Sequence, residues 1–121
     1  MADHINSLTP AQLERLALLL EEMGEAQQII GKILRHGYWS YSPKDEDETP
    51  NQRLLEKELG DVLSALDRMA VAKDIDIDTI RVDHHRAAKH EKVRRYLHYQ
   101  DDADSWRAED IRTSSTGSDQ K

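Results

Sequence analysis

The sequence predicts an all-α protein, a bundle of about three main helices that oligomerisation completes. Three long segments carry apolar residues at the spacing of a helix face, and two of them begin with residues that cap helices. No segment alternates in the manner of a strand over a useful length, because the alternating stretch 75–78 is both short and acidic. Helical segments without strands favour helix-on-helix packing.

The first helix is predicted to begin at Thr9 and to end at Gly37. Thr9 can act as the N-cap, Pro10 suits the first helical position, and Gln12 completes a capping box. Gly37 is a natural stop for the helix. Seven residues at helical spacing form the main stripe of this helix: Leu13, Leu16, Leu20, Met23, Gln27, Ile30 and Leu34.

Two further helices are predicted after a loop over residues 38–49. The second begins with the same order of residue types as the first, Thr49-Pro50-Asn51-Gln52, and is expected to end near Lys73 and Asp74. The third is expected from Asp76 or Asp78 to about Leu97, with a weaker apolar stripe. The stripe of the second helix is predicted from its spacing: Leu55, Leu59, Val62, Leu63, Leu66 and Met69.

Length and composition indicate one domain over residues 1–100, followed by a polar tail over residues 101–121. The net charge of −7 argues against binding to a nucleic-acid polymer, which usually requires a basic face. The absence of cysteine excludes disulfides and thiolate metal sites. Neither a secretory signal nor a bilayer-spanning stretch is apparent, so we expect a cytoplasmic protein with no membrane partner.

The first helix is apolar on more than one side, which predicts an oligomer. Leu18, Ile29 and Ile33 lie away from the main stripe of this helix on the helical wheel. A helix that is apolar on several faces is buried on several faces, and three helices of this size cover such a helix poorly. We therefore expect a homodimer or a homotetramer that completes a four-helix or larger bundle.

Two carboxylate pairs carry the functional prediction. Glu22 and Glu25 lie three residues apart on the first helix, and Glu58 and Asp61 lie three apart on the second. Residues at this spacing share one helix face, so two packed helices can gather four carboxylates. A single pair is common on solvated helix faces, but both of these pairs intrude on apolar faces, where an uncompensated polar group is costly. The arrangement predicts a metal site.

The ligand types favour Mg²⁺, with Mn²⁺ as a substitute. All four candidate ligands are carboxylates, and hard divalent cations prefer oxygen. Neither helix carries the Glu-x-x-His motif of di-iron bundles. The acidic run 45–48 lacks the spacing and the glycine of an EF-hand loop.

The residues around the two pairs resemble the MazG-like all-α nucleoside triphosphate pyrophosphohydrolases. The segments that carry the resemblance are 20–26 (LEEMGEA) and 55–62 (LEKELGDV), with 32–37 (KILRHG) and 96–98 (YLH) similar to a small phage and bacterial branch. The resemblance implies helical-bundle oligomers that hydrolyse the α–β phosphoanhydride of a nucleoside triphosphate or deoxynucleoside triphosphate, giving a monophosphate and pyrophosphate. It also implies that Glu22, Glu25, Glu58 and Asp61 bind Mg²⁺.

Further residues are candidates for catalysis and for binding the nucleotide. Glu21, next to the cluster, is a candidate to orient or deprotonate water, with a solvated surface acid as the alternative. Lys32 and His36 follow Glu25 on nearly the same helix face and can bind phosphate. Trp39 can stack on a nucleobase or seal the bundle end.

The third helix supplies the last three candidates for substrate binding, Lys89, Lys92 and Tyr96, which share one face. An ordinary solvated charged face is the alternative for these residues. Two other functions stay open at this point: a phosphoribosyl-ATP pyrophosphohydrolase, which has related motifs, and a non-enzymatic acidic helical module that binds a basic partner.

Overall fold

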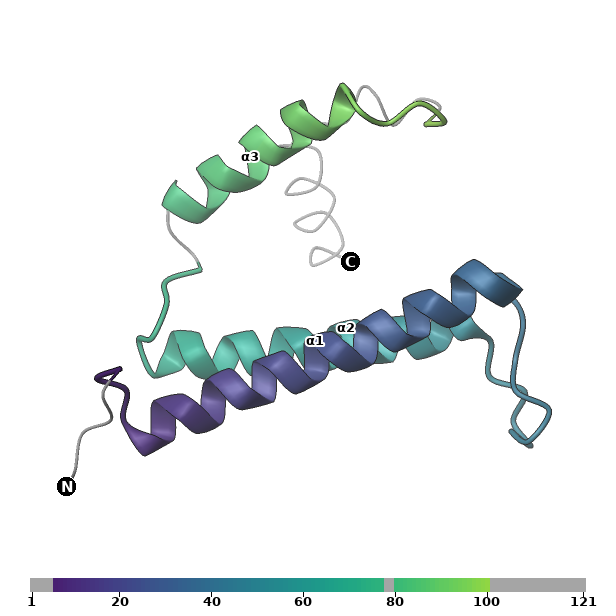
Figure 1. Cartoon of the computed structure of the whole chain (residues 1–121), viewed down its shortest axis with the longest axis horizontal. Coiled ribbons are helices and arrows are strands. Elements are labelled where there is room, and N and C mark those ends of the chain that lie inside the picture. The colour runs from purple at the N-terminus through teal and green to yellow at the C-terminus, as the bar shows by residue number, and fades with distance from the viewer. Residues whose placement is uncertain (1–5, 78–79, 101–121) are drawn as a thin grey trace, which may run out of the picture. The chain divides into compact units, whose positions relative to one another are not determined.

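The computed structural model contains three α-helices, α1 (Pro10–His36), α2 (Asn51–Val71) and α3 (Ile80–Arg94), shown in Figure 1. The structure describes residues 6–77 and 80–100, and this part of the chain contains no strand. The predicted all-α class and the number of helices are confirmed. The predicted polar tail over residues 101–121 lies outside the described residues.

The chain divides into two compact units, Met1–Ile75 and Asp76–Lys121. The first unit holds α1, α2 and the loop between them, and the second holds α3. The predicted domain over residues 1–100 therefore spans both units. Because both carboxylate pairs lie in the first unit, that unit contains the candidate site.

Helix α1 begins and ends at the predicted residues. The backbone N–H of Gln12 donates to Thr9 Oγ1 at 3.2 Å, and the backbone N–H of Thr9 donates to Gln12 Oε1 at 2.8 Å. These two bonds make the capping box, with Pro10 in the first turn. Gly37 ends the helix with a φ of 90°, a left-handed conformation that glycine adopts without a Cβ clash.

Helix α2 begins differently from the prediction. Pro50, and not Thr49, is its N-cap, and no side chain caps the helix. The loop satisfies the first amides instead, because Asn51 N–H donates to the carbonyl of Ser40 and Gln52 N–H donates to that of Tyr38, both at 2.9 Å. Backbone carbonyls from the loop thus replace the side-chain cap that residue order alone suggests.

The acidic run of the loop is partly structural. Asp45 accepts hydrogen bonds from the backbone N–H groups of Asp47 and Thr49 at 3.0 and 2.9 Å. The Thr49 backbone bond is the largest cause of a lowered pKa at Asp45, which keeps this carboxylate charged. Asp45 therefore organises the turn before α2, in the manner common for aspartate in loops.

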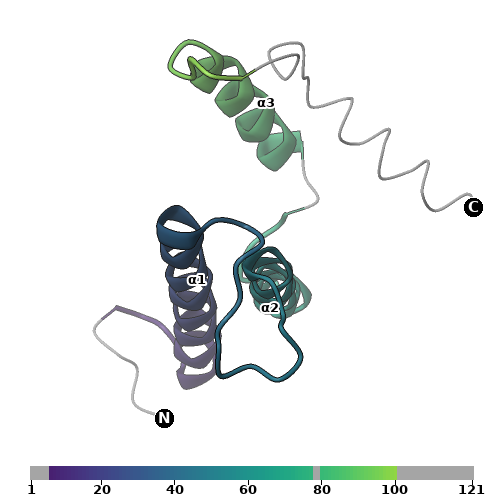
Figure 2. The ribbon, with the colours of Figure 1, turned by 90° about the vertical axis from the view of Figure 1, so that its right-hand side faces the viewer.

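Helices α1 and α2 lie side by side as an antiparallel hairpin (Figures 1 and 2). The buried apolar side chains between them are Ala26 and Ile29 from α1 and Ala65 and Met69 from α2. The two alanines leave little bulk at the crossing, so the backbones can approach closely. The hairpin core is small for helices of 27 and 21 residues.

The main stripe predicted for the first helix, Leu13 to Leu34 and called the α1 stripe from here on, does not form this core. Among its members, Leu20 is 74% exposed and Leu34 is 83% exposed, and Leu16, Met23 and Ile30 are also exposed. On α2, Leu59 and Leu63 of the predicted stripe are exposed as well. The face that packs on α2 is the other apolar side of α1, which contains Ala26 and Ile29. A helix that is apolar on two sides has only one of them covered within the single chain.

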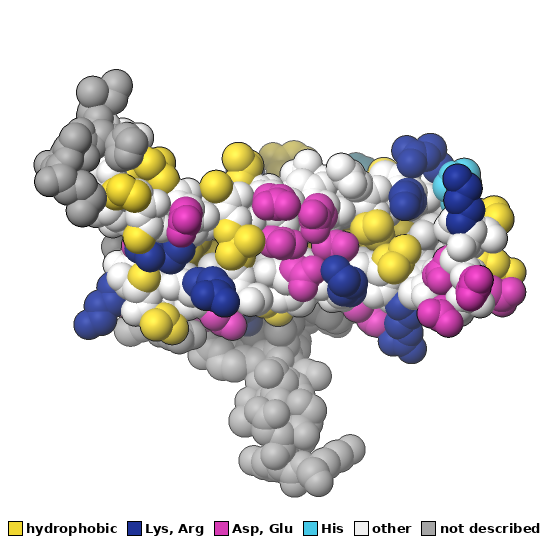
Figure 3. Space-filling model, turned by 90° about the horizontal axis from the view of Figure 1, so that it is seen from below, with side chains coloured by type: hydrophobic (Ala, Val, Ile, Leu, Met, Phe, Trp, Pro, Cys, Tyr) yellow, Lys and Arg dark blue, Asp and Glu magenta, His cyan; other side chains and the backbone are white. Residues whose placement is uncertain are grey.

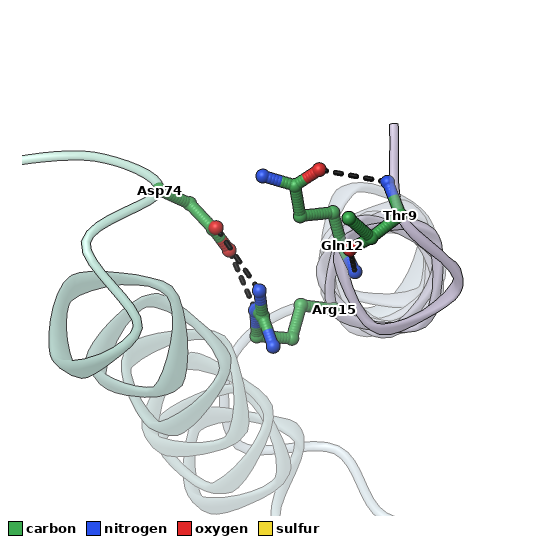
Figure 4. A network of polar contacts seen from close by, with 4 residues as sticks. All are labelled: Thr9, Gln12, Arg15 and Asp74. Carbon is green, nitrogen blue, oxygen red and sulfur yellow. Dashed lines mark hydrogen bonds and ion pairs between the residues drawn. The ribbon is translucent and has the colours of Figure 1, made fainter. Parts of the chain in front are cut away.

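An ion pair joins the open end of the hairpin (Figure 4). Arg15 on α1 binds Asp74, just after α2, through Nε to Oδ2 at 2.6 Å and Nη2 to Oδ1 at 3.0 Å. The bond to Arg15 is the main cause of a lowered pKa at Asp74. This bidentate pair is half-buried, and it fixes the start of α1 against the end of α2.

Helix α3 is shorter than the predicted segment, which ran from Asp76 or Asp78 to Leu97. It covers Ile80–Arg94, and Tyr96 and Leu97 follow it as exposed residues. No side chain described in this unit is buried. Within the described ranges, no helix has both the length and the apolar character that a bilayer crossing requires.

Candidate metal centre

The hairpin brings the two predicted carboxylate pairs together. Glu22 and Glu25 from α1 meet Glu58 and Asp61 from α2, and each offers an oxygen within 4.8 Å of the other three. We call these residues the four-carboxylate cluster. Figure 3 shows acidic side chains gathered midway along the helix pair, with hydrophobic side chains on both sides. The arrangement follows from three-residue spacing on two facing helices.

Two oxygens of the cluster are buried and lack a hydrogen-bond partner. These atoms are Glu22 Oε2 and Glu58 Oε2. The Glu58 side chain is 14% exposed, whereas the Asp61 side chain is 40% exposed. A buried carboxylate oxygen without a partner is costly, and such atoms are uncommon in folded proteins. The cluster therefore has an inner, desolvated side and an outer side open to solvent.

Burial, together with crowding of negative charge, raises the pKa of Glu22. Desolvation by burial is the largest cause, followed by repulsion from Glu25, Asp61 and Glu21. Both effects disfavour the charged form of the carboxyl group. A cation in the cluster would favour the charged form of Glu22, because it supplies positive charge and a partner for the orphaned oxygens.

Lys57 is a neighbour of the cluster that sequence reasoning missed. Its Nζ lies 2.9 Å from Asp61 Oδ2 and 3.5 Å from Glu58 Oε1. The hydrogen bond to Asp61 is the main cause of a raised pKa at Lys57. The four-residue spacing between Lys57 and Asp61 is the signal that could have revealed this contact. Lys57 supplies positive charge on the exposed side of the cluster.

The donor set fits a hard divalent cation. Every candidate ligand atom is a carboxylate oxygen, which is the ligand type that Mg²⁺ and Mn²⁺ take in proteins. The orphaned oxygens of Glu22 and Glu58 are available for such an ion. Within the described residues, no other group of three or more acidic, histidine or cysteine side chains has comparable geometry.

The remaining predicted residues of the first unit fall into two groups. Lys32 and His36 line a cavity near the end of α1, whereas Trp39 is 70% exposed and does not line that cavity. Glu21 is exposed and contributes no ligand atom, although its charge acts on Glu22. Its role in catalysis stays a prediction, as does the role of Trp39.

The three candidates after the first unit are not part of the cluster. Lys89 and Lys92 lie on α3, and Tyr96 lies in the turn that follows it. All three side chains are exposed. They belong to the unit Asp76–Lys121, so their role in substrate binding stays a prediction.

Comparison with known proteins adds no relative. No protein-family model matches the chain, and neither the curated proteins nor the solved structures give a significant match. The resemblance to the MazG-like enzymes therefore stays a prediction based on the motifs.

Proposed function

We propose that the protein is a Mg²⁺-dependent nucleotide pyrophosphohydrolase. The reaction would cleave the α–β phosphoanhydride of a nucleoside or deoxynucleoside triphosphate, giving a monophosphate and pyrophosphate. One observation supports this most strongly: the four-carboxylate cluster contains two buried oxygens without a partner. Acidic groups that serve only solubility have no reason to be desolvated against one another.

The proposal gives each group of the cluster a physical role. Glu22, Glu25, Glu58 and Asp61 would hold the ion, with Mn²⁺ able to replace Mg²⁺. When bound, the ion supplies positive charge that offsets the negative charge developing on the phosphoryl oxygens. Glu21 lies at the exposed edge of the cluster and is proposed to orient or deprotonate the attacking water. Lys32 and His36 are proposed to bind phosphate oxygens.

The first test is pyrophosphate release from a panel of canonical and modified nucleoside triphosphates, with and without Mg²⁺. We expect metal-dependent release by the natural chain and none by Glu58→Gln, since that substitution removes a buried ligand oxygen. The matched control is Glu56→Gln, a neighbouring exposed carboxylate outside the cluster. Full activity of Glu58→Gln in a helical, folded chain would contradict the assignment of ligands.

The other candidate functions are outcomes of the same test. If no triphosphate is cleaved, phosphoribosyl-ATP is the next substrate to offer, because the motifs of that enzyme class are related. If that substrate also fails and Mg²⁺ leaves the melting temperature unchanged, a non-enzymatic acidic module is favoured. Asp45 stays charged, but its oxygens accept hydrogen bonds from the loop backbone, so it is less available to bind a basic partner.

A homodimer or homotetramer is part of the proposal, as is a cytoplasmic location. The observation in favour of an oligomer is the exposed part of the α1 stripe, including Leu20 and Leu34, together with Leu59 and Leu63 on α2. Exposed apolar residues aligned on one helix face are typical of an interface. A second copy could cover this face and complete a four-helix bundle.

A further inference from the structure

A cavity of about 430 Å³ lies at the closed end of the hairpin, away from the Arg15–Asp74 pair. The last turns of α1, the loop after it and the start of α2 form its walls. A cavity of this size can hold a small polar ligand or part of a nucleotide. We call it the cationic pocket, because Lys32, Arg35 and His36 line it.

The positive charge of this pocket is not balanced by acidic side chains. Among the described residues, no carboxylate lies within ion-pair distance of Lys32, Arg35 or His36. The acidic residues 45–48 are close in sequence but do not line the pocket. Lys32 and Arg35 are exposed and carry their charge beside the cavity. A ligand with negative charge would balance them.

The loop wall of the pocket is fixed in place. Asn51 is only 5% exposed, and its Nδ2 donates to the carbonyl of Gly37 at 3.2 Å. Its backbone N–H donates to Ser40, so the loop is bound to the first turn of α2 at two points. Ser40, Tyr41 and Ser42, which each have a hydroxyl group, line this wall. Ser42 Oγ accepts a hydrogen bond from the backbone N–H of Lys44 at 3.2 Å and keeps its own proton to donate. Hydroxyl groups next to guanidinium and ammonium groups form a suitable donor set for phosphate oxygens.

The pocket lies close to the four-carboxylate cluster along both helices. Lys32 follows Glu25 by seven residues on α1, which is about 10 Å at the rise of a helix. Leu54, which also lines the pocket, precedes Glu58 by four residues on α2, or about 6 Å. One nucleotide could therefore reach both places. A nucleobase is uncharged and would leave the two cations, Lys32 and Arg35, unbalanced, whereas a phosphate group would not.

We propose that the cationic pocket is an anion subsite that binds a phosphate or diphosphate group, with Arg35 and the hydroxyls of Ser40 and Ser42 as binding groups besides Lys32 and His36. The inference that the bound group belongs to a nucleotide rests on the proposed function. The charge and shape of the pocket are observations that do not depend on that function. The same chemistry would accept the phosphate end of a substrate or free pyrophosphate released from it.

Calorimetric titration of the full chain with inorganic pyrophosphate, at low salt and without divalent metal, tests the pocket directly. We expect binding by the natural chain and about tenfold weaker binding by Arg35→Gln and by Lys32→Gln, since each loses a charge-assisted contact. The matched control is Arg53→Gln, an exposed cation at the same end of the hairpin that does not line the pocket. Circular dichroism verifies that all variants stay helical.

Two results would overturn the proposal: no binding by the natural chain, or equal losses in Arg35→Gln and Arg53→Gln. If a nucleoside triphosphate displaces the bound pyrophosphate and a nucleoside does not, the pocket binds the phosphate end of the substrate. If neither displaces it, the pocket binds free pyrophosphate. Glu58→Gln is expected to bind pyrophosphate as the natural chain does. If the natural chain binds pyrophosphate but shows no metal-dependent turnover, the proposed function is refuted and the assignment of the pocket as an anion subsite is supported.

Discussion

Glu22 is a residue at which the proposed metal binding and the stability of the metal-free chain oppose each other. Its raised pKa means that the folded chain binds this proton more tightly than the unfolded chain does. The contribution of this group to stability is therefore full below the unfolded pKa and is lost as the pH rises through the folded pKa. At neutral pH and without metal, the charged Glu22 destabilises the hairpin.

Replacing Glu22 by glutamine is thus expected to stabilise the metal-free chain. We predict that Glu22→Gln raises the melting temperature at pH 7 by roughly 2–4 °C, because a neutral side chain avoids the desolvation of a charge. The same variant should lose the stabilisation that Mg²⁺ gives the natural chain. Thermal denaturation with and without Mg²⁺ measures both effects. A lower melting temperature without metal would show that the charge of Glu22 is compensated.

Lys57 competes with a metal ion for the same carboxylates. Its ammonium group lies 2.9 Å from a candidate ligand oxygen of Asp61, so cation binding must overcome its repulsion or displace it. We predict that Lys57→Gln binds Mn²⁺ or Mg²⁺ about two- to fivefold more tightly, the range expected for an exposed charge. Metal titration followed by calorimetry measures this, with Lys44→Gln in the loop as the control. Weaker metal binding by Lys57→Gln would instead assign Lys57 to positioning Asp61.

At the scale of elements, the ends of α1 were predictable because each end depends on neighbouring residues. Thr9, Pro10 and Gln12 form the expected capping box, and Gly37 adopts the expected positive φ. The start of α2 was not predictable in this way, since its amides are satisfied by carbonyls of the loop. That contact depends on how a distant segment folds, and residue order near Pro50 does not contain it.

The carboxylate pairs were predictable from their spacing, whereas the face of α1 that packs on α2 was not. The spacing of Glu22 and Glu25 placed both on one face, and the structure brings that face to Glu58 and Asp61. The α1 stripe was an obvious apolar face, yet α2 packs against the opposite one. Both faces of α1 are apolar, so periodicity alone cannot say which one the same chain covers. The cationic pocket was also missed as a cavity, because the loop forms one of its walls.

The Arg15–Asp74 pair fastens α1 to the end of α2, and its effect depends on pH. The pKa of Asp74 is lowered in the folded chain, so its contribution is present above the unfolded pKa and is lost as the pH falls through the folded pKa. We predict that Asp74→Asn lowers the melting temperature at pH 7 by roughly 5 °C and that the difference disappears in acid. Thermal denaturation across pH measures it, with Asp67→Asn as the control. A difference that persists at low pH would assign the loss to packing.

For the whole molecule, the exposed α1 stripe and the four-carboxylate cluster make separable predictions. All four candidate ligands come from one chain, whereas a second copy of the chain is proposed to cover the stripe. Leu20, at 74% exposed, is the natural place to introduce a charge. We predict that Leu20→Glu converts the oligomer to monomers, as measured by size-exclusion chromatography with light scattering. A two-fold interface contains each leucine twice, so the substitution should weaken association by roughly 100-fold or more.

The control for this variant is Gln28→Glu, which adds the same charge at an exposed position outside the stripe. The monomeric Leu20→Glu chain should still gain thermal stability from Mg²⁺, because the cluster does not need the partner to be complete. If Leu20→Glu becomes monomeric and also loses the effect of Mg²⁺, then oligomerisation holds α1 and α2 in the register that gathers the carboxylates. If the natural chain is already a monomer, the proposed oligomer is refuted.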